Sequence, residues 1–292
     1  MARKKIQVAI LGSGNVGSDL LMKIERSPFL ACSLFIGKNS DSPGLERAHK
    51  MGVPVSYDSI DAIVRKPTVC DIVFDATSAK NHRMHAPILR KLKKFTIDLT
   101  PSKVGVMCVP AINLGEAIKK QNVNMISCGG QANAPLIFAL MKLYPKTPYV
   151  EIVSSIASKS AGISTRDNID EYTQTTSEGI CGLTGVYKTK TIIVLNPADP
   201  PIDMHNTIYA RILNPDMEKI RRAIAGASRD IQQYVPGFRV TVPPVFENNR
   251  VTMMTEVVGL GDFLPVYAGN LDIINCAAVI VAEAYARKML KR

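Results

Sequence analysis

The sequence of 292 residues contains no tryptophan, and none of its six cysteines is spaced from another as C-x-x-C. The missing spacing argues against a zinc site and against a thioredoxin-like redox pair. No stretch approaches the ~18–20 consecutive apolar residues that a membrane-spanning helix needs. Internal repeats and low-complexity segments are also absent. We therefore expect a soluble, cytoplasmic protein that holds no metal and contacts no membrane.

The composition is close to that of an ordinary soluble enzyme, with 46% hydrophobic and 21% charged residues. It excludes intrinsic disorder, collagen and a coiled coil as the main architecture. Lysine and arginine number 36 against 25 acidic residues, a formal charge of +11 that attracts polyanions, coenzymes included. The basic residues are scattered and are not interleaved with aromatics. This distribution favours a surface that steers an anionic substrate, and we expect no nucleic-acid partner.

The first half of the chain alternates short apolar runs with amphipathic segments, the pattern of β-α units on a parallel sheet. The length, at ~150 residues per domain, predicts two domains. We expect an α/β protein with a nucleotide-binding first domain and a mixed second domain. A helix is expected to open near Asn133, because Pro135 is preorganised for a first helical turn. The expected strands cover residues 6–11, 32–36, 72–75, 96–99, 106–109, 123–127, 150–156, 191–195, 207–212 and 251–258.

A glycine-rich turn, Gly12-Ser13-Gly14-Asn15-Val16-Gly17, follows the first expected strand and opens a helix. This is the context that a dinucleotide-binding fingerprint requires, although a purely structural turn is the alternative. An acid at the end of the second strand would grip the adenosine ribose of NAD, but Lys38 and Asn39 follow that strand. These two residues favour a 2′-phosphate, whereas Asp41 is the alternative contact to the ribose. NAD is the expected cofactor, with NADP as a second hypothesis.

Cys128 differs from the other five cysteines because it stands between an apolar strand and an expected helix, followed by Gly129-Gly130. A helix N-terminus stabilises a thiolate, and the two glycines are expected to offer N–H groups to an oxyanion. Beside a nicotinamide, such a thiolate attacks an aldehyde and retains the acyl group as a thioester after hydride loss. A buried, unreactive cysteine is the alternative.

The whole chain resembles the acylating acetaldehyde dehydrogenases of the meta-cleavage pathway type. Their motifs occur in order as VAILGSGNVGSDL, VFDATSA, IDLTPS, NVNMISCGGQA, SSIASKSAG, TRDNIDEYT, LNPADPP, YVPGFR and LPVYAGNLDI. The resemblance implies an architecture like that of glyceraldehyde-3-phosphate and aspartate-semialdehyde dehydrogenases. A Rossmann-type domain over residues 1–130 is then completed by a C-terminal helix at 269–292, and residues 131–268 form an α+β catalytic and dimerisation domain.

The resemblance also implies an activity, in which a short-chain aldehyde, coenzyme A and NAD give acyl-CoA and NADH. It makes Cys128 the thioester-forming nucleophile and implies a homo-oligomer. The family often pairs with a 4-hydroxy-2-oxovalerate aldolase, so such a partner and a standalone enzyme are both expectations. The cofactor contacts that the resemblance assigns are Ser13, Gly14, Asn15, Val16, Ser160, Ala161, Gly162, Ile163, Ser164, Thr165, Arg166, Asp167, Asn168 and Asn270.

Three positions depart from the family pattern. Ile163-Ser164 replaces a usual Pro-Gly pair in the cofactor loop. Asn206 stands where the family has an aspartate thought to assist the cysteine, and an amide cannot act as a base; His205 and Asp203 are the candidate replacements. The segment between Arg239 and Met254 is shorter than the family's usual one.

Two other functions stay open. One is a phosphorylating semialdehyde dehydrogenase on the same fold, which needs a phosphate-binding set and a histidine base beside the cysteine. The other is a non-catalytic dinucleotide-binding sensor, with Asn206 as a mark of lost activity. Dependence of turnover on coenzyme A separates the first from the acylating enzyme, and any turnover excludes the second.

Overall fold

The computed structural model describes residues 5–162, 166 and 169–291. The chain divides into two compact units. Unit 1 comprises Met1–Met125 and Asn275–Arg292, and unit 2 comprises Ile126–Ile274. The α/β class expected from the sequence is confirmed, because a parallel sheet with helices forms unit 1 and a second sheet with helices forms unit 2.

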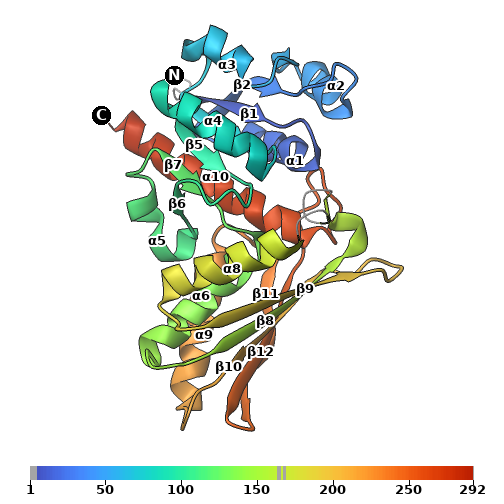
Figure 1. Cartoon of the computed structure of the whole chain (residues 1–292). Coiled ribbons are helices and arrows are strands. Elements are labelled where there is room, and N and C mark those ends of the chain that lie inside the picture. The colour runs from blue at the N-terminus through green and yellow to red at the C-terminus, as the bar shows by residue number, and fades with distance from the viewer. Residues whose placement is uncertain (1–4, 163–165, 167–168, 292) are drawn as a thin grey trace. The chain divides into compact units, whose positions relative to one another are not determined.

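Unit 1 contains a seven-stranded parallel sheet in the order β3-β2-β1-β4-β5-β7-β6 (Figure 1). Its strands are β1 (Ile6–Leu11), β2 (Leu30–Ile36), β3 (Val55–Ser56), β4 (Ile72–Asp75), β5 (Phe95–Asp98), β6 (Val106–Met107) and β7 (Asn122–Asn124). Its helical elements are α1 (Asn15–Glu25), α2 (Pro43–Lys50), α3 (Asp61–Arg65), η1 (Pro67–Val69), α4 (Ala79–Lys91), α5 (Pro110–Ala117) and the C-terminal part of α10 (Gly269–Leu290).

The strand order explains where unit 1 presents polar groups. The chain turns back at β1, pairing it with β2 on one side and β4 on the other. Right-handed crossovers in opposite directions place α1 and α4 on opposite faces of the sheet. The carboxyl ends of the strands on either side of such a switch point form the crevice where α/β proteins bind ligands. β1, β4 and β5 are almost wholly buried. Polar side chains at the ends of these strands are therefore candidates for a functional role.

Helix α10 returns the end of the chain to unit 1. Tyr285 stacks on Phe95 of β5 with ring centroids 3.9 Å apart and planes 5° from parallel. The hydroxyl of Ser27, just after α1, donates to Glu283 of α10 at 2.7 Å. These contacts close the core of unit 1 with residues that lie more than half the chain length away in the sequence.

Unit 2 contains a five-stranded sheet in the order β11-β12-β10-β8-β9. β8 and β9 are parallel and the other neighbours are antiparallel. Helices α6, α8 and α9 pack against this sheet and one another (Figure 1). The elements are α6 (Cys128–Leu143), β8 (Val150–Ala157), η2 (Ser158–Ser160), α8 (Ile169–Thr184), β9 (Thr189–Asn196), β10 (Met204–Ala210), α9 (Met217–Gln232), β11 (Phe238–Glu247) and β12 (Arg250–Val257).

Alternation along β10 shows how the sheet of unit 2 is covered. Met204, Asn206, Ile208 and Ala210 are buried on the face toward the helices, whereas the residues between them are partly exposed on the other face. A period of two is the signature of a sheet with one packed face. β11 and β12 meet in a two-residue turn at Asn248-Asn249, both with positive φ, the geometry that right-twisted hairpins favour.

The sequence prediction of a helix start near Asn133 is wrong. α6 begins at Cys128, because the Ser127 hydroxyl accepts the Gly130 N–H and caps it, and Pro135 lies inside the helix. Among the residues that the structure describes, no helix has the length and apolar character needed to cross a membrane.

Candidate active site

The glycine-rich turn between β1 and α1 can only be built from glycine at two positions. Gly12 has φ +114°, and a Cβ there would lie 2.5 Å from the Ala76 carbonyl oxygen. A Cβ on Gly17 would lie 1.8 Å from the Gly12 carbonyl oxygen. Any side chain at either position would therefore break the turn. The turn leads into α1, whose first N–H groups have no intrahelical partner and suit an anion.

A cleft of about 620 Å³, here called the Ser13 cleft, opens beside this turn. The Ser13 hydroxyl lies 2.7 Å from that of Ser42. The volume is in the range of small-molecule sites. An acidic side chain is missing at the end of β2, and Asp41 is the acid that lines the cleft. The lining residues are Leu11, Gly12, Ser13, Ile36, Gly37, Lys38, Asn39, Asp41, Ser42, Pro43, Ser59, Thr77, Ser78 and Asn81.

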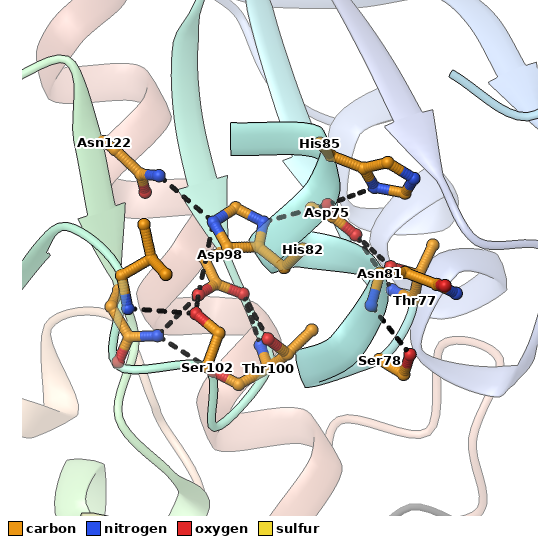
Figure 2. Close-up of polar contacts among 12 residues, drawn as sticks. Asp75, Thr77, Ser78, Asn81, His82, His85, Asp98, Thr100, Ser102 and Asn122 are labelled. Atoms are coloured by element: carbon orange, nitrogen blue, oxygen red, sulfur yellow. Dashed lines mark hydrogen bonds and ion pairs between the residues drawn. The ribbon is translucent and has the colours of Figure 1, made fainter. Parts of the chain in front are cut away.

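Behind the cleft, a buried polar cluster joins the carboxyl ends of β4 and β5 (Figure 2). His82 of α4 places Nδ1 2.9 Å from Asp75 Oδ2 and Nε2 3.5 Å from Asp98 Oδ2. His85 places its own Nδ1 2.8 Å from Asp75 Oδ2. Asp75, His82 and Asp98 have no exposed surface. Two carboxylates can be buried this way because an imidazolium between them supplies the opposite charge.

The charges in this cluster follow from its contacts. Burial alone raises the pKa of Asp75, but hydrogen bonds from His82 and His85 outweigh it and hold that pKa below the usual range. Burial alone lowers the pKa of His82, but Asp75 and Asp98 outweigh it and raise that pKa. Burial keeps the pKa of Asp98 raised. These directions favour a protonated His82 between the two carboxyl groups.

The cluster also fixes the loop that lines the Ser13 cleft. The second carboxylate oxygen of Asp75 accepts the N–H of Thr77 at 3.1 Å and its hydroxyl at 2.5 Å. Thr77 lines the cleft, and the preceding Ala76 is the residue against which Gly12 packs. Asp75 thus connects the buried cluster to the wall of the cleft.

In unit 2, Cys128 is the first residue of α6 and is 9% exposed. Its Sγ lies 3.2 Å from the hydroxyl oxygen of Tyr172, which also accepts the N–H of Gly129 at 3.1 Å. Burial raises the pKa of the Cys128 thiol, and the Tyr172 hydroxyl and the N–H groups of the helix start oppose this rise. The N–H groups of Gly129 and Gly130 both have partners within the protein, the second being Ser127. The expectation that these two groups are open to an oxyanion is therefore not met.

Asn206 lies at the centre of a buried amide and hydroxyl network beneath α6. Its Oδ1 accepts from the hydroxyl of Ser154 at 2.7 Å and from Asn133 at 3.2 Å, and its Nδ2 donates to Thr255 at 3.2 Å. Strand register sets Ser154 and Thr255 directly opposite Asn206 on β8 and β12. Asn133 in turn donates to the Gly129 carbonyl at 2.8 Å. The network supports the helix start that carries Cys128.

Neither proposed replacement for the missing aspartate is in this network. His205 is adjacent to Asn206 on β10 and therefore points to the opposite face of the sheet. Its Nε2 lies 3.7 Å from Glu256. Asp203 also lies near Glu256, because burial and the charge of Glu256 raise the pKa of Asp203. His205 and Asp203 thus do not take the place of an aspartate beneath α6.

The structure brings together two of the expected cofactor-contact elements of unit 2. Asn270, at the start of α10, donates to the Ser160 carbonyl at 3.4 Å, and its buried Oδ1 has no hydrogen-bond partner among the described residues. Arg166 donates to the carbonyl oxygens of Ala161 at 3.2 Å and Ser158 at 2.5 Å. Gly162 is exposed. The remaining loop positions, Ile163, Ser164, Thr165, Asp167 and Asn168, lie outside the described residues.

Gly14, Asn15 and Val16 lie at the start of α1, where the sequence placed them. The contacts of Tyr172, Asn133 and the Asp75 cluster were not predicted from the sequence. Two of these lie in segments that were quoted for the resemblance, yet a contact across 44 residues leaves no local pattern.

Comparisons with known proteins identify the family of the chain. Residues 7–121 match the family model "Semialdehyde dehydrogenase, NAD binding domain", and residues 128–265 match "Prokaryotic acetaldehyde dehydrogenase, dimerisation". An acetaldehyde dehydrogenase of Spirochaeta aurantia is 50% identical over 98% of this chain and 97% of its own length. One of Geobacillus stearothermophilus is 48% identical over 98% of each.

Among solved structures, an aspartate semialdehyde dehydrogenase of Candida albicans with NADP matches with a TM-score of 0.65 and 11% identity, covering 97% of this chain and 100% of its own. Aspartate semialdehyde dehydrogenase II of Vibrio cholerae, complexed with ASA, matches with a TM-score of 0.62 and 13% identity over 99% of each chain. These two likenesses confirm the expected fold. The chain belongs to the acetaldehyde dehydrogenase family and is an NAD(P)-binding aldehyde dehydrogenase.

Proposed function

We propose that the enzyme is CoA-acylating. A short-chain aldehyde such as acetaldehyde or propanal, coenzyme A and NAD(P)⁺ would give acyl-CoA and NAD(P)H through a thioester on Cys128. The observation that carries this proposal is the position of Cys128 at the N-terminus of α6, in contact with a phenol hydroxyl. A thiol in this position is a nucleophile whose anion is favoured by the helix dipole and by hydrogen bonding.

The reaction starts when the thiol of Cys128 loses its proton to water. The thiolate then attacks the aldehyde carbon, a C–S bond forms, and the carbonyl electron pair moves to oxygen. The nicotinamide cofactor, when bound, supplies the acceptor for the hydride of this thiohemiacetal. Collapse of the oxyanion leaves an acyl thioester on Cys128. The thiol of coenzyme A, as its thiolate, then takes the acyl group and returns the Cys128 thiolate.

Each unit, taken by itself, offers residues that fit part of the cofactor. In unit 1, the glycine turn and the α1 start suit the pyrophosphate, with Ser13, Gly14, Asn15 and Val16 as its contacts. In unit 2, the Oδ1 of Asn270, which has no hydrogen-bond partner within the part of the chain that the structure describes, suits the N–H₂ of the nicotinamide carboxamide. Ser160 lies against Asn270 and belongs to the same proposed contact.

The end of β2 supports use of both NAD and NADP. Lys38 and Asn39 line the Ser13 cleft where an NAD-specific fold has its ribose-binding acid. Lys38 supplies a positive charge for a 2′-phosphate, whereas Asp41 on the same wall favours an unphosphorylated ribose. We propose that the balance between these two side chains sets the cofactor preference.

The phosphorylating alternative is less well supported. His205 is the sole histidine in the sequence of unit 2, and it points away from the face that carries α6. The base that such an enzyme needs beside its cysteine is therefore missing from the described part of unit 2. Coenzyme A brings a thiol as its nucleophile, and a thiol needs no such base. The phosphates of coenzyme A also suit a protein with a net charge of +11.

We further propose a homo-oligomer that pairs through unit 2, because the matched region is described as a dimerisation domain. The partly exposed face of the five-stranded sheet is the proposed interface. A 4-hydroxy-2-oxovalerate aldolase, which releases a short-chain aldehyde, is the proposed partner that supplies the substrate.

The test follows reduced nicotinamide formation from acetaldehyde and from propanal, with and without coenzyme A, and with NAD and NADP in parallel. Cys128→Ser is the control variant. Turnover that requires coenzyme A and is lost in the variant supports the proposal. Turnover that requires phosphate instead supports the phosphorylating alternative. Cofactor binding without turnover on either aldehyde would contradict the proposal and favour a sensor.

A further inference from the structure

The contact between Tyr172 and Cys128 depends on the glycine that follows the cysteine. Tyr172 lies on α8, is 7% exposed, and brings its hydroxyl to the first turn of α6. A Cβ on Gly129 would lie 2.7 Å from the Tyr172 hydroxyl oxygen. The phenol therefore reaches the sulfur only because residue 129 is a glycine.

The proton of this phenol can be assigned from its neighbours. The N–H of Gly129 is a donor, so the phenol oxygen accepts from it at 3.1 Å. The Thr176 hydroxyl donates to the main-chain carbonyl of Tyr172 at 2.7 Å, so Ser127, 2.6 Å away, donates to Thr176. Ser127 is also a hydrogen-bond partner of the phenol, but its oxygen already accepts from the N–H of Gly130, so we assign the O–H of Tyr172 to Sγ of Cys128, 3.2 Å away.

We propose that the phenol of Tyr172 is a catalytic hydrogen-bond donor to the sulfur of Cys128 and stabilises its thiolate. The N–H of Gly129 polarises the phenol, and the phenol passes this polarisation to the sulfur. Tyr172 keeps its own proton throughout. The thiol proton goes to water, and the O–H···S contact of the thiol becomes the stronger O–H···S⁻ contact of the thiolate. This inference rests on Cys128 being the nucleophile of the proposed function.

The side chains described beside the first turn of α6 favour Tyr172 for this role. Those nearest the Cβ position of Gly129 are Tyr172 and Thr176 of α8 and Ser154 of β8, and Tyr172 is the titratable one among these three. Asn206, beneath the helix start, carries no charge. Burial raises the pKa of Tyr172 well above its usual value, which favours the protonated phenol that the donor role needs. A hydrogen bond to a charged group is among the stronger kinds in proteins.

The test measures ionisation of Cys128 without turnover. The rate of alkylation by iodoacetamide and the ultraviolet absorbance of the thiolate are followed against pH, with Cys128→Ser as the background. Tyr172→Phe is expected to move the ionisation midpoint up by about one pH unit, which slows alkylation about tenfold at a fixed lower pH. Tyr149→Phe is the matched control, because its hydroxyl donates to Glu151 at 2.8 Å instead.

An unchanged or lower midpoint in folded Tyr172→Phe overturns the proposal. If that variant does not fold, 3-fluorotyrosine placed at position 172 keeps the shape and strengthens the donor. The midpoint should then fall, and a rise or no change overturns the proposal. A shifted midpoint in an enzyme that shows no turnover dependent on coenzyme A separates the two claims, since it supports this inference and contradicts the proposed function.

Discussion

Replacing His82 by glutamine tests whether an imidazolium holds the buried cluster of unit 1 together. His82 lies 2.9 Å from Asp75 and 3.5 Å from Asp98, all three without exposed surface. Removing one partner from a buried ion pair costs 3–5 kcal/mol in typical cases. Because His85 still donates to Asp75, we expect the lower end, about 3 kcal/mol of the free energy of unfolding. With an m-value of about 3 kcal/mol per M, the urea midpoint falls by about 1 M.

The pH dependence distinguishes charge from packing. The folded pKa of His82 is raised above its unfolded value near 6.5, so its stabilisation is fully present below that value and is lost as pH rises through the folded pKa. The deficit of His82→Gln should therefore be larger at about pH 6 than at about pH 9. The depressed pKa of Asp75 keeps that carboxylate ionised over this whole window.

Urea unfolding at both pH values provides the measurement, and His49→Gln is the control because His49 is an exposed histidine of unit 1. Equal deficits at the two pH values would refute the assignment of His82 as the cation. A deficit no larger than that of the control would refute the role of the cluster in stability.

Three further predictions concern the cleft and the network under α6. Gly17→Ala should abolish NAD binding in equilibrium dialysis, because its Cβ would lie 1.8 Å from a backbone oxygen, and a wild-type Kd contradicts this. Lys38→Ala should weaken binding of 2′,5′-ADP by about tenfold, the value of one charge-assisted contact, and spare 5′-AMP. Lys50→Ala is its control, and equal losses for both ligands contradict the 2′-phosphate role. Asn206→Leu should cost about 2–3 kcal/mol in thermal unfolding, because three hydroxyl and amide partners lose their bonds, and an unchanged melting temperature contradicts it.

The sequence predicts the parallel sheet of unit 1 well because its strands are short apolar runs bounded by turns. The expected strand at 72–75 coincides with β4, and that at 6–11 with β1. Local pattern decides such elements, since a buried parallel strand is apolar on both faces.

Glycine and proline account for the misread helix start. Gly129 and Gly130 lower the helix propensity of the first turn of α6, so the helical sequence pattern starts after them. Pro135 then resembles a first-turn residue, although inside a helix it only forfeits one hydrogen bond and strains the preceding turn. The capping serine, Ser127, was the correct signal.

β11 was not predicted as a strand because Pro243 and Pro244 interrupt its pattern. The strand lies at the edge of its sheet, where a missing N–H can face solvent. Register shifts between Val240 and Val242, and between Val242 and Val245, accommodate the two prolines.

The candidate site likewise contains residues that a local sequence pattern reveals and residues that only the fold brings together. The glycine turn and Cys128 could be found from the sequence because each lies in a local strand–turn–helix pattern. The Tyr172 phenol and the His82 cation could not, because each acts on a residue of another element. Such pairings depend on how helices pack on the sheets, which no local pattern records.

Helix α10 has a consequence for the order in which the chain acquires its structure during synthesis. Its N-terminal turn belongs to unit 2 and the rest, from Asn275, to unit 1. A nascent chain that has released only its first 125 residues lacks the ring that stacks on Phe95 and the carboxylate that accepts from Ser27. Unit 2 emerges whole, whereas the core of unit 1 stays open until α10 has been synthesised. A chain truncated before Glu283 should therefore be prone to aggregation.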